Sequence, residues 1–180
     1  PLPAKPVQKP TKLRIGYFSA DFHDHPTLRL MSGVLAAHDS SRFEIYAYSY
    51  GATRHGEIRE QLAKQVDKFS DILGVTNLDV VTQARAHGLD IAVDLKGYTQ
   101  NTRSELFAYR LAPIQINYLG YPSTMGADFI DYIVADATVI PEEQREHYSE
   151  SIIYLPHSYQ PNDSTRKIAD STITRAALSL

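Results

Sequence analysis

The sequence predicts an α/β fold, namely a doubly wound, mostly parallel, Rossmann-like sheet. Short apolar runs alternate along the chain with stretches of helical periodicity, which is the pattern of such a sheet. One run, residues 90–95, is apolar enough for burial on both faces. The chain has 180 residues and no cysteine, which suits one domain that builds its core without disulfides.

Each element follows from one of these runs. The segments with helical periodicity are 26–38, 56–64, 78–87 and a short one at 104–109. The strands are expected at 13–18, 43–49, 66–70, 90–95, 114–119, 132–135 and 152–155. We expect Tyr46, Tyr48 and Tyr50, which alternate near a strand end, to serve packing rather than stacking on a ligand. The charges between residues 57 and 68 indicate the solvated face of a helix.

The two ends of the chain differ from its middle. Residues 1–11 hold four prolines among lysines and small residues, which is typical of an extended linker. Residues 12–173 form the predicted domain. Residues 174–180 have the pattern of an amphipathic helix that stops before any C-cap, so we interpret them as a truncated helix.

Composition excludes several classes of function. Without cysteine there is no thiol nucleophile and no thiolate zinc site, and His87 and His157 have no partner at ligand spacing, so no metal is predicted. A net charge of −3 disfavours nucleic acid as a partner. No apolar run approaches the roughly 20 residues that cross a bilayer, and no signal sequence begins the chain, so no membrane is expected and the location is predicted to be cytoplasmic. Neither a Gly-x-Gly-x-x-Gly fingerprint nor a P-loop occurs.

Three loops are expected to meet at one crevice. A doubly wound sheet commonly has strand order 3-2-1-4-5-6, so the first and fourth strands are neighbours and ligands bind beyond their carboxyl ends. The loops that leave the first, fourth and fifth strands are residues 19–27, 94–99 and 120–126. We therefore predict that these segments share one rim of the sheet.

The first of these loops ends with His25 before Pro26. Proline favours an extended predecessor and the first helical position, so His25 is expected at or near the N-cap, with its imidazole in the crevice. The positive end of the helix would lower the pKa of a nearby imidazole and keep it neutral, as a base must be. The alternative is that Asp21, Asp24 and Thr27 cap the helix while His25 is an exposed turn residue.

The other two loops have similar alternatives. Gly97 follows a buried strand, where a chain turns sharply or approaches a ligand, and Thr99 offers a hydroxyl at the same edge. Asp94 can orient a histidine, accept a sugar hydroxyl, or simply cap the turn. Asp90 begins the strand and belongs to the opposite edge. The third loop, with two glycines and a proline, suits a segment beneath a ligand or an ordinary connection.

The same loops carry a resemblance to the O-GlcNAc transferase and SPINDLY family of glycosyltransferases. The match covers the chain after the linker and its motifs occur in the family's order. They are Arg14-Ile15-Gly16-Tyr17 to Asp21-Phe22, His25-Pro26-Thr27, Gly97-Tyr98-Thr99, Arg103-Ser104-Glu105-Leu106-Phe107-Ala108, Ala112-Pro113-Ile114-Gln115, Gly120-Tyr121-Pro122 to Asp131-Tyr132-Ile133, and Tyr148-Ser149-Glu150 to Leu155-Pro156.

The resemblance implies a two-lobed GT-B enzyme of which residues 12–173 are the N-terminal catalytic lobe. Such an enzyme transfers N-acetylglucosamine from UDP-GlcNAc to serine or threonine of a protein acceptor, with inversion, and needs no metal or other cofactor. Most donor contacts would lie in a C-terminal lobe beyond this chain, which alone would be inactive, and TPR repeats can precede it. The alternatives are a SPINDLY-like enzyme that uses GDP-fucose and a non-catalytic module that binds a small ligand.

The resemblance also implies roles for single residues. His25 matches a histidine that serves as base or orients the acceptor, and Asp94 is the second catalytic candidate. Lys96 lies with Asp94 on the acceptor side, and Thr99 lies near the donor sugar. Ser123 stands where the family usually has glycine, so the course of that loop is an open question. The other substrate-binding candidates are Gly97, Tyr98, Tyr121, Pro122 and Thr124.

Overall fold

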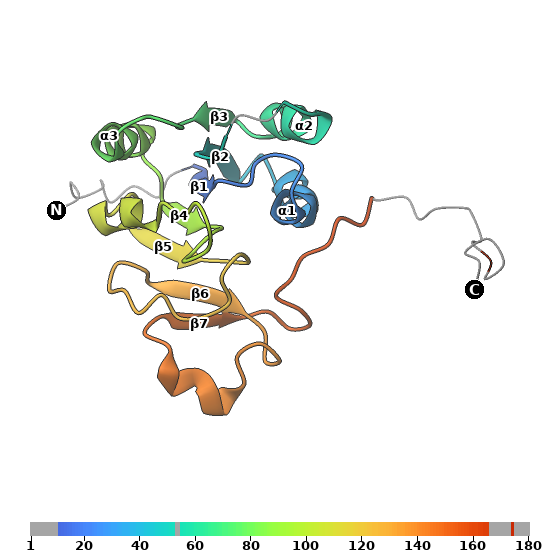
Figure 1. The fold of residues 1–180 in the computed structure, drawn as a ribbon, viewed down its shortest axis with the longest axis vertical. Helices are drawn as coiled ribbons and strands as arrows, with labels where there is room; N and C mark the ends of the chain where they lie inside the picture. Colours follow the sequence, from blue (N-terminus) through green and yellow to red (C-terminus); the bar gives the residue numbers. More distant parts are fainter. Residues whose placement is uncertain (1–10, 53–54, 166–173, 175–180) are drawn as a thin grey trace.

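A computed structural model describes residues 11–52, 55–165 and 174, and in it seven parallel strands form one sheet (Figure 1). Their order is β3-β2-β1-β4-β5-β6-β7, which confirms the predicted order and extends it by a seventh strand. The strands are β1 (Leu13–Ser19), β2 (Phe43–Ser49), β3 (Lys68–Asp71), β4 (Ile91–Asp94), β5 (Ile114–Asn117), β6 (Tyr132–Ala135) and β7 (Ser151–Tyr154).

Helices cover both faces of the sheet. In Figure 1, α1 and α2 lie on one side of the strands, and α3 lies on the other. The helices are α1 (Pro26–Ala36), α2 (Glu57–Gln65) and α3 (Asn77–His87), with 3-10 helices η1 (Ser104–Tyr109) and η2 (Glu142–His147). Each face therefore buries its own apolar layer, one against α1 and α2 and one against α3 and η1.

The aromatic packing beside α3 confirms the expectation for the tyrosines in and directly after β2. Tyr48 is completely buried and its ring stacks on Phe18 with centroids 4.3 Å apart. Tyr50 is buried in the same cluster, and Tyr46 packs against it. These rings fill the core rather than a ligand site.

Several predicted boundaries move by one or two residues for identifiable reasons. The strand predicted at 114–119 ends at Asn117, because Leu119 has a φ of 71°, which no strand residue adopts. The strand predicted at 66–70 begins at Lys68, since Val66 ends α2 as its C-cap. Helix α1 stops at Ala36 instead of residue 38, and η2 was not expected from the pattern.

The expectation that the charges of α2 are all solvated is wrong for Arg59. This side chain is buried, and its guanidinium donates to the Phe22 carbonyl at 2.8 Å and to Ser49 Oγ at 3.0 Å. It also pairs with Asp71 and lies over the Phe69 ring, 4.6 Å from the centroid. Arg59 thus ties α2 to the carboxyl edge of the sheet, a role that helical periodicity does not reveal.

Both predicted end segments fall outside the described residues, apart from Thr11 and Thr174. Within the described ranges, no helix combines the length and apolar character needed to cross a membrane.

The loop after β2 depends on close contact with the loop after β1. A Cβ atom on Gly51 would lie 1.9 Å from the Ala20 carbonyl oxygen, which is backbone and cannot rotate away. We predict that Gly51→Ala lowers the free energy of unfolding by about 3 kcal/mol, measured by urea denaturation. Gly56→Ala is the control, because nothing lies within 4 Å of its Cβ position, and only the loss of a fair N-cap residue, about 1 kcal/mol at most, is expected. Equal losses in the two variants would contradict the steric explanation.

Candidate functional site

A cavity of about 410 Å³ lies at the carboxyl edge of the sheet, and we call it the carboxyl-edge cavity. It is lined by Asp21, His23, His25, Thr27, Lys96, Thr99, Gln100, Asn101 and Gly120. These residues come from the segments that follow β1, β4 and β5. The prediction that three loops share one rim is therefore confirmed, and His25 and Thr99 line the same cavity.

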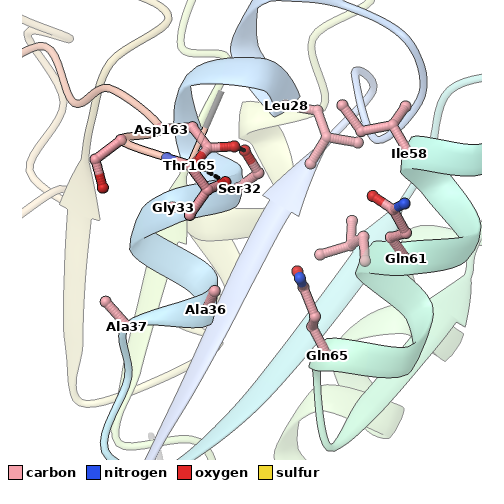
Figure 2. Close-up of a pocket in the computed structure, with 12 residues that line it drawn as sticks. Leu28, Ser32, Gly33, Ala36, Ala37, Ile58, Gln61, Gln65, Asp163 and Thr165 are labelled. Carbon is pink, nitrogen blue, oxygen red and sulfur yellow. Dashed lines mark hydrogen bonds between the residues drawn. The ribbon is translucent and has the colours of Figure 1, made fainter. Parts of the chain in front are cut away.

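A second cavity, of about 420 Å³, lies between α1 and α2 (Figure 2). Its lining is apolar side chains, small residues and two glutamines, with Asp163 at one side bonded to Ser32 Oγ at 3.2 Å. None of its described lining residues is a histidine or carries positive charge. The residues that can move a proton or bind an anion gather in the carboxyl-edge cavity instead.

His25 is the N-cap of α1, as predicted. Its backbone is extended, with φ −144° and ψ 149°, and Pro26 follows as the first helical residue. The imidazole Nδ1 accepts a hydrogen bond from the Thr27 amide at 3.2 Å. The side chain is 37% exposed, so one end of the ring stays accessible from the cavity.

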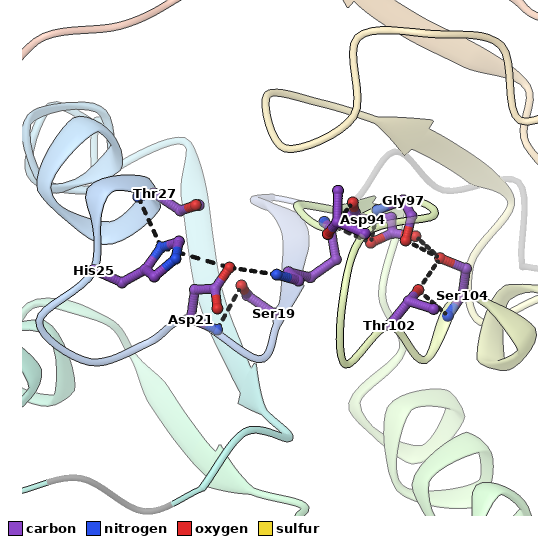
Figure 3. Close-up of polar contacts among 10 residues, drawn as sticks. Ser19, Asp21, His25, Thr27, Asp94, Gly97, Thr102 and Ser104 are labelled. Carbon is purple, nitrogen blue, oxygen red and sulfur yellow. Dashed lines mark hydrogen bonds and ion pairs between the residues drawn. The ribbon is translucent and has the colours of Figure 1, made fainter.

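Asp21 lies between His25 and the loop after β4 (Figure 3). Its Oδ2 accepts a hydrogen bond from Lys96 Nζ at 2.7 Å and lies 3.6 Å from His25 Nδ1. Both side chains of the Asp21–Lys96 pair are only 9% exposed. The sequence marks Asp21 only as a possible capping residue of α1 and not as part of the site. No local pattern marks it, because its partner Lys96 is 75 positions away.

Asp94 caps the turn that follows β4, which is one of the roles that the sequence allows. Its Oδ1 accepts hydrogen bonds from the backbone amides of Lys96 at 2.9 Å and Gly97 at 3.1 Å, and its Oδ2 accepts one from Ser104 Oγ. The carboxyl group is completely buried, and this burial raises the pKa of Asp94 above its usual value. A catalytic role for Asp94 stays a prediction, and these contacts favour a role in shaping the loop that carries Lys96 and Thr99.

The loop after β4 is compact because Gly97 has a φ of 52° and packs beneath a ring. A Cβ on Gly97 would lie 2.4 Å from Tyr121 Cβ, so a larger residue does not fit. Tyr98 is 51% exposed, and its ring meets Tyr121 edge to face at 5.6 Å. Thr99 Oγ1 donates to the Lys96 carbonyl at 2.9 Å, which holds the turn. Gly97 and Tyr98 belong to this loop and Tyr121 packs against it, but none of the three lines the carboxyl-edge cavity.

The remaining predicted residues lie further from this cavity. Thr124 Oγ1 donates to Glu150 Oε2 at 2.7 Å, and the Pro122 carbonyl accepts from Tyr148 Oη at 3.4 Å. Ser123 belongs to the same loop, and its carbonyl accepts from Asn117 Nδ2 at 3.3 Å. The ligand contacts proposed for Pro122 and Thr124 stay predictions.

Sequence reasoning missed other members of the cavity. The His23 and His25 rings meet edge to face with centroids 5.6 Å apart. Gln100 and Asn101 line the opposite side, and Asn101 has a φ of 61°, which asparagine tolerates better than most residues. The spacing His-x-His was visible in the sequence, but only the cavity shows that both rings belong to one site.

The site combines two imidazoles, a carboxylate paired with an ammonium group, two hydroxyl groups and two side-chain amides. Such a set can hydrogen-bond a polyhydroxylated ligand and can accept a proton from one of its hydroxyl groups. In the part of the chain that the structure describes, no cluster of three acidic or histidine side chains could hold a metal ion.

Comparison with known proteins agrees with the resemblance seen in the motifs. A family profile described as Glycosyl transferase family 41 matches residues 2–176. An Arabidopsis thaliana protein named probable UDP-N-acetylglucosamine--peptide N-acetylglucosaminyltransferase SEC is 36% identical over 94% of this chain. A Caenorhabditis elegans protein named UDP-N-acetylglucosamine--peptide N-acetylglucosaminyltransferase is also 36% identical, over 92% of the chain.

A solved structure adds the three-dimensional likeness. The Thermobaculum terrenum O-GlcNAc transferase mutant K341M superposes with a TM-score of 0.83 at 34% identity, over 89% of this chain. The chain spans only 17% and 14% of the Arabidopsis and C. elegans relatives, and 31% of the solved chain.

The bond from Ser104 Oγ to the buried Asp94 carboxylate gives a test of the site's framework. We predict that Ser104→Ala lowers the free energy of unfolding by about 1–3 kcal/mol at neutral pH, because a buried charged acceptor loses its donor. The measurement is urea unfolding, with Ser40→Ala at an exposed position as the control.

The same variant has a predictable pH dependence. Burial raises the pKa of Asp94, so the folded state binds its proton more tightly than the unfolded state, and stability falls as pH rises through the window above the ordinary aspartate value. The Ser104 hydroxyl stabilises the charged form, so its loss should matter less once Asp94 is protonated. We expect the deficit of Ser104→Ala to shrink as the pH is lowered from about 8 to about 4. A deficit independent of pH would contradict this account.

Proposed function

We propose, from the premise that the chain belongs to glycosyl transferase family 41, that it is part of an inverting enzyme that transfers N-acetylglucosamine from UDP-GlcNAc to serine or threonine of a protein. The observation that carries the proposal is the convergence of His25, Lys96 and Thr99 on one cavity in a chain whose relatives bear peptide N-acetylglucosaminyltransferase names. The carboxyl-edge cavity would hold the acceptor side of the reaction.

His25 is the group best placed for the acceptor hydroxyl. In the proposed step the acceptor oxygen attacks the anomeric carbon, the bond from that carbon to the phosphate oxygen breaks, and UDP leaves with the electron pair. The hydroxyl proton passes to the His25 imidazole. A positioned base is worth roughly 10² to 10⁴ in rate, and orientation of the two substrates supplies much of the rest.

The charge of the carboxyl-edge cavity suits binding of the acceptor better than binding of the donor's diphosphate. Lys96 supplies the ammonium group among the described lining residues, and Asp21 pairs with it at 2.7 Å. A balanced site suits neutral hydroxyl groups, whereas a departing diphosphate needs positive charge or several oriented donors. We therefore place most donor contacts in a second lobe, so that this chain alone would be inactive.

This chain spans only 17% and 14% of the two relatives, so proteins of that length can hold both a second lobe and TPR repeats. We include both features in the proposal. The names of two relatives favour UDP-GlcNAc as the donor, because SEC and the C. elegans protein, both 36% identical to this chain, are named for UDP-N-acetylglucosamine.

The donor assignment has a direct test. Incubation of the full-length protein and an acceptor protein extract with labelled UDP-GlcNAc and, separately, labelled GDP-fucose should place label on serine or threonine from UDP-GlcNAc only. Mass spectrometry of the labelled peptides identifies the modified residue. If only GDP-fucose labels the acceptor, the donor is GDP-fucose and not UDP-GlcNAc. If either donor binds without transfer, the protein is a binding module and not an enzyme.

The role of His25 has a separate test. We predict that His25→Ala in the full-length protein lowers kcat roughly 10²- to 10⁴-fold, because the acceptor hydroxyl loses the group that accepts its proton. The change in melting temperature should stay small, since the side chain is 37% exposed. His147→Ala, at an exposed position of η2, is the matched control and should leave kcat within about twofold of the parent. Equal turnover of the His25 variant and the parent would rule the role out.

A further inference from the structure

We infer that Asp21 is a positioning residue that decides which nitrogen of His25 carries the ring hydrogen. The inference rests on the proposed function and adds a residue that neither the motifs nor the names of the relatives assign. It starts from the two neighbours of one atom, His25 Nδ1. The Thr27 amide lies 3.2 Å from it and Asp21 Oδ2 lies 3.6 Å from it.

These two neighbours require opposite states of the ring. The Thr27 amide is a donor, so it needs a lone pair on Nδ1, which places the single hydrogen of a neutral ring on Nε2. In that state His25 donates from Nε2 and cannot accept a proton there. Asp21 Oδ2 is an acceptor and favours the hydrogen on Nδ1. Only this second state leaves a lone pair on Nε2 for the acceptor hydroxyl.

Asp21 is held where it can favour the second state. Its Oδ2 is the same oxygen that accepts from Lys96 Nζ at 2.7 Å, and its backbone amide donates to Ser19 Oγ at 3.0 Å. The ion pair with Lys96 fixes the position of the carboxylate, and 9% exposure leaves little water to screen it. A shift of about 0.7 Å would bring Nδ1 to ordinary hydrogen-bond distance.

The charges around His25 fit this role. Asp21 approaches the ring from its own loop, Lys96 approaches Asp21 from the loop after β4, and the His23 ring lies 5.6 Å away edge to face. After proton transfer to Nε2 the ring is positive, and the Asp21 carboxylate lies 3.6 Å from Nδ1, close enough to stabilise that charge. The proton stays on Nε2 until the products leave and water removes it. Asp21 thus acts through His25.

The test compares Asp21→Asn with Asp24→Asn in the full-length protein. Asp24 is three residues away, exposed, and paired with Arg29 on the surface at 2.7 Å, so it controls for loss of a carboxylate in the same loop. We expect Asp21→Asn to lower kcat roughly 10- to 100-fold with the KM for UDP-GlcNAc within about twofold. Asp24→Asn should change neither. Parent-like kcat in Asp21→Asn would overturn the inference.

The pH profile separates positioning from a merely structural role. A nearby carboxylate stabilises the protonated ring, so its removal should shift the acid limb of the kcat profile to lower pH, and Asp21→Glu, which keeps the charge, should leave the limb near that of the parent. In a His25→Ala background, Asp21→Asn should have almost no further effect. An unshifted limb, or the same loss in both backgrounds, would overturn the inference while leaving the enzyme's activity established.

Removal of Asp21 alone leaves a buried ammonium group and can unfold the protein. In that case the double variant Asp21→Asn/Lys96→Met removes both charges of the buried pair together, and the same shift of the acid limb relative to the parent is expected. Nitrogen NMR of labelled histidine gives a readout that needs no turnover. The fraction of His25 with its hydrogen on Nδ1 should fall in Asp21→Asn and hold in Asp24→Asn, and an unchanged fraction in Asp21→Asn would refute the role.

Discussion

The loops after β1 and β4 are joined by an ion pair that water scarcely reaches, Asp21 with Lys96. Removing two charges from water is unfavourable, and the pair is stable only because the partners meet at 2.7 Å and their backbones are fixed as well. Loss of either partner would leave the other buried and unpaired, typically at roughly 3–5 kcal/mol. This contact links the loop that carries His25 to the loop that carries Thr99, and so it helps to shape the carboxyl-edge cavity.

The sheet register makes the pair possible. Phe18 of β1 lies beside Asp94 of β4, so the two strands end level and their loops leave side by side. Backbone bonding continues past the strands, with the Leu95 amide on the Phe18 carbonyl at 3.0 Å. On the other side of β4, Gly120 approaches so closely that a Cβ would lie 2.1 Å from the Leu95 carbonyl oxygen. Strained backbone at Leu119 precedes it, which is common beside functional sites.

Local pattern was enough to predict the sheet, its order and the convergence of three loops, because apolar period and the chirality of parallel crossovers decide these features. Local pattern also predicts His25 as the N-cap of α1, because Pro26 restricts the backbone conformation of the residue before it. It could not reveal contacts between distant residues. In the sequence Arg59 looks like one more helical charge, and only the structure shows its contacts with Asp71 and Phe22. In the same way, only the structure shows that Asp21 pairs with Lys96 of the loop after β4.

His25 Nδ1 can accept a hydrogen bond from the Thr27 amide or donate one to Asp21, and the two bonds contribute similar free energies. A side-chain N-cap bond contributes about 1 kcal/mol to a helix, while a hydrogen bond to a charged group contributes roughly 1.5–3 kcal/mol when the geometry is good. At 3.6 Å the bond to Asp21 is not yet formed, so the cap holds the ring in its resting state. In the inferred shift toward Asp21 this balance reverses, and α1 loses the bond from the Thr27 amide to its N-cap side chain while the bond from the Arg29 amide to the His25 carbonyl remains. The helix terminus thus positions the imidazole without fixing where its hydrogen must be.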